Sequence, residues 1–239
     1  MTNKGLVFFA GLSLVLFQSL AHGMGLRSFV ALPVEQGGTV LRSTIERNAD
    51  TDNATLVFNA AVGISSWQTL LLGLPYRLSP SGSERLGDIG ALYRQIIVQS
   101  DTTAGTDRLG VLAGVVIPTA GERDEALQVG MVFTHYRGRH EIDLDGLYQR
   151  DLGGQASTAR YDMSWQYRIS PREYPDWGIP NEWYVVTELG GRWKQDNTAI
   201  HQMTFGLQRV AKRWVVEGGV IQDVNSPHET RYLFSIRFH

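Results

Sequence analysis

Apolar and polar side chains alternate along most of the second half of the chain. In the last such stretch, Thr230 to Phe238, every second residue from Tyr232 onwards is aromatic or aliphatic. Because successive side chains of a β-strand point to opposite faces, such a stretch has one apolar face and one mostly polar face. The alternation recurs in the ranges 127–134, 141–149, 160–169, 202–208 and 214–221. Repeated alternation over segments of about ten residues is typical of the strands of membrane barrels.

Towards the N-terminus the second face of each stretch is small or apolar more often than charged. We interpret five ranges there as further strands: 38–48, 53–64, 67–78, 87–98 and 107–118. With one more strand that spans Trp183 to Trp193, the total is then about twelve strands. An even number lets the first and last strands pair, with both termini on the periplasmic side.

The connections between these strands give a second test. Two-residue turns at Ala211-Lys212 and Arg137-Gly138 would pair Gly206 with Glu217 and Thr134 with Glu141, polar face to polar face. A slip of one residue would exchange the faces, so this agreement favours a meander. Longer loops are expected at 79–86, 99–106 and 223–229, and the Pro/Trp-rich stretch 170–180 is expected on the periplasmic side.

The N-terminus predicts export. Lys4 precedes an almost wholly apolar run from Gly5 to Leu20, and Ala21 and Gly23 place small residues before a cleavage site. This is the pattern of a secretory signal peptide. We expect a signal peptide at 1–23 and a barrel domain at 24–239; an uncleaved anchor is the alternative.

Two tryptophans indicate what the apolar face meets. Trp183 and Trp193 lie ten residues apart on one face of one strand, which is about 23 Å along the normal once the strand is tilted by about 45°. That span fits the apolar band of an outer-membrane barrel, about 25 Å tall and flanked by aromatic girdles. The predicted interfacial girdle consists of Trp165, Trp183, Trp193, Trp214 and Phe238.

The opposite face carries many charges, whose burial in a tight soluble core would be costly unless they were paired. A water-filled or salt-bridged lumen would remove that cost. A turn at Gly153-Gly154 would place Asp145 diagonal to Arg160 on the neighbouring strand, where the two could form a salt bridge. The predicted lumen-lining residues are Asp143, Asp145, Arg160, Asp162, Arg168, Glu188, Arg192, Glu217 and Arg231. We therefore expect an all-β, antiparallel up-and-down transmembrane β-barrel with a lumen that is charged on one wall and small or apolar on the other.

Composition excludes several functions. The net charge of −2 and the absence of a polybasic tract argue against nucleic-acid binding, and the absence of cysteine excludes disulfides and thiolate sites. No Gly-rich phosphate loop or paired-histidine metal spacing occurs, so we expect no cofactor and no metal.

Several short motifs resemble the outer-membrane proteins named for the meta pathway of phenol degradation. They are Gly87-Asp88-Ile89-Gly90, Ile117 to Gly121, and Tyr161 to Ser170 followed by Pro171. Ala120 stands where the family motif runs directly from threonine to glycine. The ending at Phe238, before the final His239, resembles the signal read by the barrel-assembly machinery. The resemblance implies an outer-membrane barrel that passes hydrophobic or aromatic small molecules, and it hands over no catalytic residues.

Enzymatic barrels are the main competing class. Outer-membrane phospholipases and deacylases use a histidine with a serine two residues on, and no His-x-Ser occurs here. His140, Glu141, Asp143 and Asp145 could form a protease-like acidic cluster or a cation site, but lumenal charges balanced by Arg160 and Arg168 are the favoured interpretation.

We therefore predict a non-enzymatic channel or transporter in the outer membrane of a Gram-negative bacterium, with passive passage of small solutes. Its expected partners are outer-membrane lipid, the barrel-assembly machinery and the solute. A hydrolase of lipase or protease type and a non-conducting structural barrel remain the alternatives.

Overall fold

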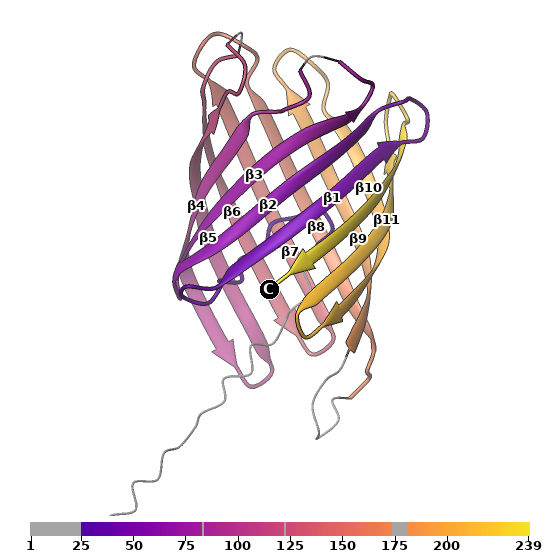
Figure 1. The fold of residues 1–239 in the computed structure, drawn as a ribbon. Coiled ribbons are helices and arrows are strands. Elements are labelled where there is room, and N and C mark those ends of the chain that lie inside the picture. Colours follow the sequence, from indigo (N-terminus) through magenta and orange to yellow (C-terminus); the bar gives the residue numbers. More distant parts are fainter. Residues whose placement is uncertain (1–24, 83, 122, 174–180) are drawn as a thin grey trace, which may run out of the picture.

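The chain forms a closed barrel of twelve antiparallel strands, seen in the computed structural model of the protein (Figure 1). The structure describes residues 25–82, 84–121, 123–173 and 181–239. The strands are β1 (Thr39–Asn48), β2 (Ala54–Ser65), β3 (Gln68–Ser79), β4 (Ile89–Thr102), β5 (Gly105–Ile117), β6 (Ala126–Arg137), β7 (His140–Asp151), β8 (Thr158–Ser170), β9 (Asn181–Lys194), β10 (Ile200–Ala211), β11 (Trp214–Asp223) and β12 (Thr230–Phe238). The predicted fold class is confirmed.

Every strand pairs with its neighbours in the chain, and β1 pairs with β12 to close the ring. Closure leaves no strand edge with unpaired backbone groups, which is the condition for a sheet to cross a bilayer. No helix among the described residues has the length and hydropathy needed to span a membrane. The predicted signal peptide, residues 1–23, lies outside the described residues.

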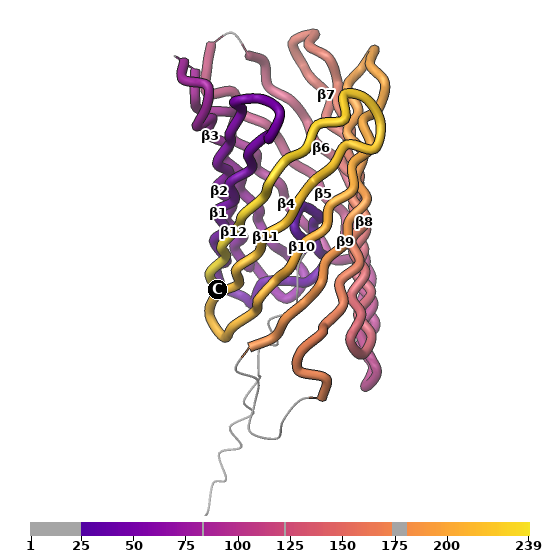
Figure 2. The backbone as a smooth tube through the Cα atoms, turned by 90° about the vertical axis from the view of Figure 1, so that its right-hand side faces the viewer, coloured from indigo at the N-terminus to yellow at the C-terminus, as the bar shows by residue number. Residues whose placement is uncertain are grey.

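The two ends of the barrel differ. We call the end that holds the connections 49–53, 80–88, 118–125, 152–157, 195–199 and 224–229 the loop end, and the opposite end, where β12 finishes, the turn end. Figures 1 and 2 show the marked C-terminus towards the turn end. β8 ends and β9 begins at the turn end, and most of the predicted periplasmic stretch 170–180 lies outside the described residues.

Three predicted connections were wrong in detail. The expected loop at 99–106 is mostly strand, because β4 runs on to Thr102 and β5 starts at Gly105. The two-residue turns fall one residue later than predicted, at 212–213 and 138–139, so Glu217 pairs with Gln208 and Glu141 with Tyr136. A pairing shift of two residues keeps each side chain on its face, which is why the predicted faces survive the error.

The outer face of the barrel is apolar. On β6 and β10 the outward positions expose large side chains, as at Val129 (60%) and Phe205 (54%), where a soluble protein would bury them. Exposed apolar surface on most strands is expected only when lipid covers it. The outer face is therefore the membrane-facing surface.

Candidate functional site

The first described residues lie inside the barrel. We call residues 25–32 the lumen segment; in Figures 1 and 2 it is the indigo trace enclosed by the strands. Leu26, Ser28, Val30 and Ala31 are buried. From there the chain reaches the turn end, where the Gly37 N–H donates to the Gly63 carbonyl before β1 begins. The lumen is thus occupied by the protein's own chain.

Acidic and hydroxyl side chains of the wall accept the N–H groups of the lumen segment. The Glu188 carboxylate accepts both the Arg27 N–H, at 3.1 Å to each oxygen, and the Ser28 N–H at 3.4 Å. Asp145 accepts the Phe29 N–H at 2.7 Å, and the Thr134 hydroxyl accepts the Ala31 N–H at 2.8 Å. Buried backbone donors need such partners, so these contacts fix the position of the segment.

Arginines of the wall donate to the carbonyl groups of the same segment. The Arg94 guanidinium donates to the Val30 carbonyl and, at 2.7 Å, to the Leu32 carbonyl. Arg42 does the same for Leu26. The barrel side chains therefore pair with the segment's backbone as a neighbouring strand would.

The side chains of the lumen segment complete two apolar clusters inside the barrel. Leu26 packs with buried residues that include Tyr184, Val215 and Leu233. It lies against two facing glycines: a Cβ placed at Gly206 or Gly219 would come within 2.5 or 3.0 Å of Leu26 Cδ1. Both distances are shorter than a normal van der Waals contact. The Leu26 side chain therefore fits in this place because neither glycine has a Cβ.

At the other end of the segment, Ala31 joins a second cluster, built on β4, β5, β6 and β7. Phe29 packs against that cluster, and its ring also lies 4.4 Å from the Arg160 guanidinium carbon. The contacts of the segment do not follow the predicted division into a charged and an apolar wall. Carboxylates hold it on β7 and β9, but the apolar cluster around Leu26 is built on β9 to β12, and Arg94 contacts it from β4.

The structure places all nine predicted lumen-lining residues on inward positions of their strands. Six of the nine form the following ion pairs, some with other wall residues: Asp162 with Arg160 and Arg192, both at 2.7 Å; Asp145 with Arg160 at 3.3 Å; Glu217 with Arg42 at 2.9 Å and Arg237 at 3.0 Å; and Arg231 with Asp223 at 2.5 Å. On the described inner wall, Arg42, Arg160, Arg192, Arg231 and Arg237 each contact at least one acid.

The predicted acidic cluster is divided by the sheet. Glu141, Asp143 and Asp145 are buried on the inner side. His140 lies outside, where its ring stacks on Trp165 and is tilted against Tyr167. Asp143 accepts hydrogen bonds from the Thr134 hydroxyl at 2.6 Å and from the Gln166 amide at 2.8 Å. Within the described residues no group of three acidic or histidine side chains is placed to hold a metal ion.

The five predicted girdle residues are placed differently from one another. Trp165, Trp183 and Phe238 are exposed on the outer face, and Arg209 stacks between Trp183 and Trp214, with its guanidinium carbon 5.7 and 5.2 Å from the two rings. Trp193, on the same set of alternating β9 positions as Trp183, is 36% exposed and also contributes to the lining of a cavity at the loop end.

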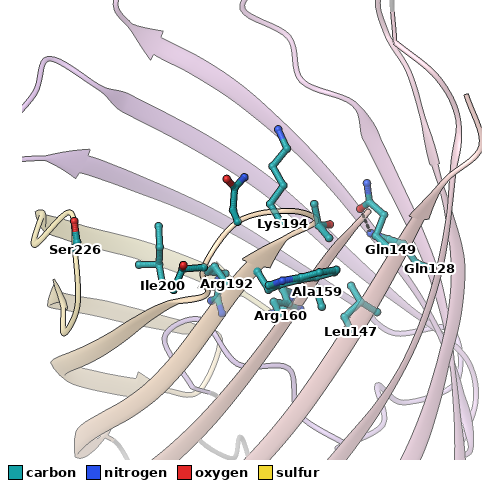
Figure 3. A pocket seen from close by; sticks show the side chains of 13 residues that line it. Gln128, Leu147, Gln149, Ala159, Arg160, Arg192, Lys194, Ile200 and Ser226 are labelled. Atoms are coloured by element: carbon teal, nitrogen blue, oxygen red, sulfur yellow. Dashed lines mark hydrogen bonds between the residues drawn. The ribbon is translucent and has the colours of Figure 1, made fainter. Parts of the chain in front are cut away.

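That cavity, which we call the vestibule, has a volume of about 670 Å³ (Figure 3). Arg160, Arg192 and Lys194 supply its charges, and Leu147 and Ile200 supply apolar wall. Figure 3 shows the side chains of β7, β8 and β9 converging on it.

Two further cavities flank the lumen segment. The crevice, of about 360 Å³, runs between the segment and β1, β2 and β3, and Arg160 and Arg192 line both it and the vestibule. The turn-end chamber, of about 490 Å³, reaches Leu32 of the segment and is lined by residues such as Arg108 and Tyr184. The segment therefore narrows the lumen between its two ends.

The sequence interpretation missed the lumen segment and the residues that hold it, among them Arg42 and Arg94. One signal was available: about fifteen residues separate the predicted cleavage site from the first strand, and the apolar run Phe29-Val30-Ala31-Leu32 falls among them. Inward glycines such as Gly206 were a weaker signal, because glycines are common in strands of this chain.

Known structures share this architecture. No protein-family model matches the sequence, and no curated protein sequence matches it. Among solved structures, the COG4313 outer membrane channel from Pseudomonas putida F1 is similar with a TM-score of 0.59 and 13% identity, over 87% of this chain and 97% of that one. The NanC porin (0.57, 11%, 83% and 99%) and the KdgM porin (0.56, 9%, 84% and 98%) are similar too. At these identities the likeness establishes the outer-membrane barrel fold.

Proposed function

We propose that this protein is a passive outer-membrane channel for small organic solutes. One observation carries the proposal: the vestibule and the crevice both have Arg160 and Arg192 in their lining, so the two cavities adjoin at these side chains, beside the lumen segment. Solute would enter through the vestibule, pass these two arginines, follow the crevice along β1 to β3 and leave at the turn end.

The lining of this route favours solutes with both polar and apolar parts. The crevice combines arginines, such as Arg42 and Arg237, with aliphatic wall, such as Val57 and Leu71. A carbohydrate chain or an aromatic acid would meet partners of both kinds. The KdgM porin has been solved in complex with disordered oligogalacturonate, a chain of sugar acids, and the resemblance to the meta-pathway outer-membrane proteins points to aromatic solutes.

Export and assembly complete the proposal. The signal peptide at 1–23 would deliver the chain to the periplasm. β12, which exposes the aromatic residues Tyr232, Phe234 and Phe238 on the outer face, would be read by the barrel-assembly machinery. The nine lumen residues named from the sequence would set the selectivity of the route, and the exposed aromatics would lie at the membrane interfaces.

The test is reconstitution of the purified barrel. In planar bilayers we expect discrete, non-rectifying current steps in potassium chloride, and vesicles containing the protein should swell in small sugar acids. The matched variant is Leu71→Trp, which adds bulk to the crevice without changing charge, and its current steps should be smaller. Absence of current from correctly folded wild-type protein, together with absence of swelling, would refute the channel.

A further inference from the structure

The vestibule has a composition that suits one class of ligand. No acidic residue occurs among the described residues that line it, whereas Arg160, Arg192 and Lys194 all do. We propose that the vestibule binds small organic acids, with the carboxylate at Arg160 and Arg192 and the apolar body against the adjacent aliphatic and aromatic wall. This inference rests on the proposed function, since it names the solute class that enters the channel.

Arg160 retains hydrogen-bonding capacity that the wall does not use. Its contacts with Asp162 and Asp145 are both made by Nη1, at 2.7 and 3.3 Å. Nη2 and Nε then have no acceptor among the described residues, although the side chain is 22% exposed. An arginine can hold a carboxylate with two parallel N–H donors, and Nη2 with Nε is such a pair.

The geometry of that arginine is fixed in advance. Asp162 accepts from Arg160 and from Arg192, so one carboxylate holds both guanidinium groups in place. The Phe29 ring of the lumen segment lies against Arg160 from the other side. A side chain held in this way loses little conformational entropy when a ligand binds, which favours affinity.

Lys194 adds attraction at longer range. In Figure 3 it extends away from Arg160 and Arg192 into the open part of the vestibule. One carboxylate at the arginines would therefore not contact the lysine directly. Its charge would instead raise the local concentration of anions, and salt would weaken that effect.

The apolar half of the site lies beside the cationic half. Leu147 and Ile200 line the vestibule from β7 and β10, and Trp193 contributes next to Arg192. The volume of about 670 Å³ is within the range of small-molecule sites, roughly 300–1,000 Å³. An acid with one ring and a short chain would fit with space for water.

The experiment is calorimetric titration of the full-length, detergent-purified barrel with three probes: 4-phenylbutyrate, its neutral amide and acetate. We expect phenylbutyrate to bind at least about tenfold more tightly than either other probe, since the amide lacks the charge and acetate lacks the ring. Equal binding of the amide, or equal binding of acetate, would overturn the proposal.

Variants test the assignment to Arg160. Arg160→Gln should weaken phenylbutyrate binding about tenfold or more, and Arg160→Lys should recover part of it. Arg123→Gln is the matched control, because Arg123 also lies at the loop end, also contacts two acids, at 2.7 and 3.4 Å, and does not line the vestibule. Unchanged binding in Arg160→Gln, or an equal loss in Arg123→Gln, would overturn the assignment.

Single-channel recording separates this inference from the proposed function. Phenylbutyrate should shorten the open periods of the wild-type channel and have less effect on Arg160→Gln. Current that phenylbutyrate leaves unchanged would refute the binding site and leave the channel standing. Binding by calorimetry to a barrel without any current would refute the channel and leave the site standing.

Discussion

Glu188 shows how a buried charge can be stabilised by backbone groups rather than by a counter-ion. Its carboxylate accepts two N–H groups and the Ser28 hydroxyl, and only 2% of the residue is exposed. Hydrogen bonds from N–H groups can satisfy a carboxylate as an arginine does. The sequence analysis identified Glu188 as inward-facing, but no residue pattern indicated that its partner would be the lumen segment, 161 positions earlier.

Glu188→Ala should therefore release the lumen segment. Two backbone donors lose their acceptor, at a cost of about 1–3 kcal/mol each. We expect larger current steps in planar bilayers and faster reaction of a maleimide with a cysteine introduced at Val30, which is 1% exposed in the folded protein. The native chain has no cysteine to interfere.

Glu188→Gln is the control for that prediction. Glutamine keeps one oxygen acceptor, so labelling and current should be intermediate between the wild type and Glu188→Ala. Labelling of the cysteine at the wild-type rate in Glu188→Ala would show that the remaining contacts hold the segment without Glu188.

At the scale of the element, β10 and β11 combine pairing with a recess for a side chain. Gly206 and Gly219 are opposite one another in the register and both face Leu26. Gly218, the next residue along β11, faces outwards, where a Cβ would have only an ordinary contact at 3.8 Å. Two adjacent glycines therefore have different roles, which alternation predicts once the partner of the inner face is known.

Gly219→Val should disturb the packing of the Leu26 side chain, whereas Gly218→Val should not. The new Cβ at position 219 would meet Leu26 and the Phe205 carbonyl, at 3.0 and 2.8 Å. Overpacking of this kind costs about 1–3 kcal/mol. We expect a lower midpoint of urea unfolding in lipid vesicles for Gly219→Val alone, and equal midpoints for the two variants would contradict the assignment.

Strands were predictable where one face is charged and the other apolar, as on β7 and β8. Ends were less predictable: nothing in Gln99 to Thr102 stops β4, and the tight turn depends on pairing with β5 at Gly105. The segment 25–32 could not be found from periodicity, because it forms no ladder and its partners are side chains. Alternation in the sequence therefore predicts which face of the sheet a side chain occupies, but it does not predict contacts between residues far apart in the chain.

At the scale of the whole molecule, one sheet has an apolar face that contacts lipid and a charged face that lines the lumen. The outer face exposes apolar side chains on nearly all strands, and the inner face buries acids such as Asp143 and Glu217. Contact with lipid is favourable for the apolar outer face and would be unfavourable for the buried acids of the inner face. The barrel therefore depends on a strict assignment of each residue to one face.

Phe205→Arg should impair folding into bilayers. Phe205 lies near the middle of β10 and is 54% exposed on the outer face. An arginine at the midplane of a barrel costs about 2–4 kcal/mol. We expect a smaller folded fraction, measured as the heat-modifiable band on a gel; Gly121→Arg, in an exposed loop with no atom within 4 Å of its Cβ position, is the control.

The lumen segment has a consequence for the order of events during assembly. It precedes every strand in the chain, yet its contacts reach Glu188 on β9 and Gln202 on β10, which are synthesised much later. Contacts so distant in sequence form slowly, because a long loop must close first. The lumen segment must therefore remain in contact with water until β9 and β10 have formed. Ring closure and the filling of the lumen then become a single late step, and a barrel with an unfilled lumen marks unfinished assembly.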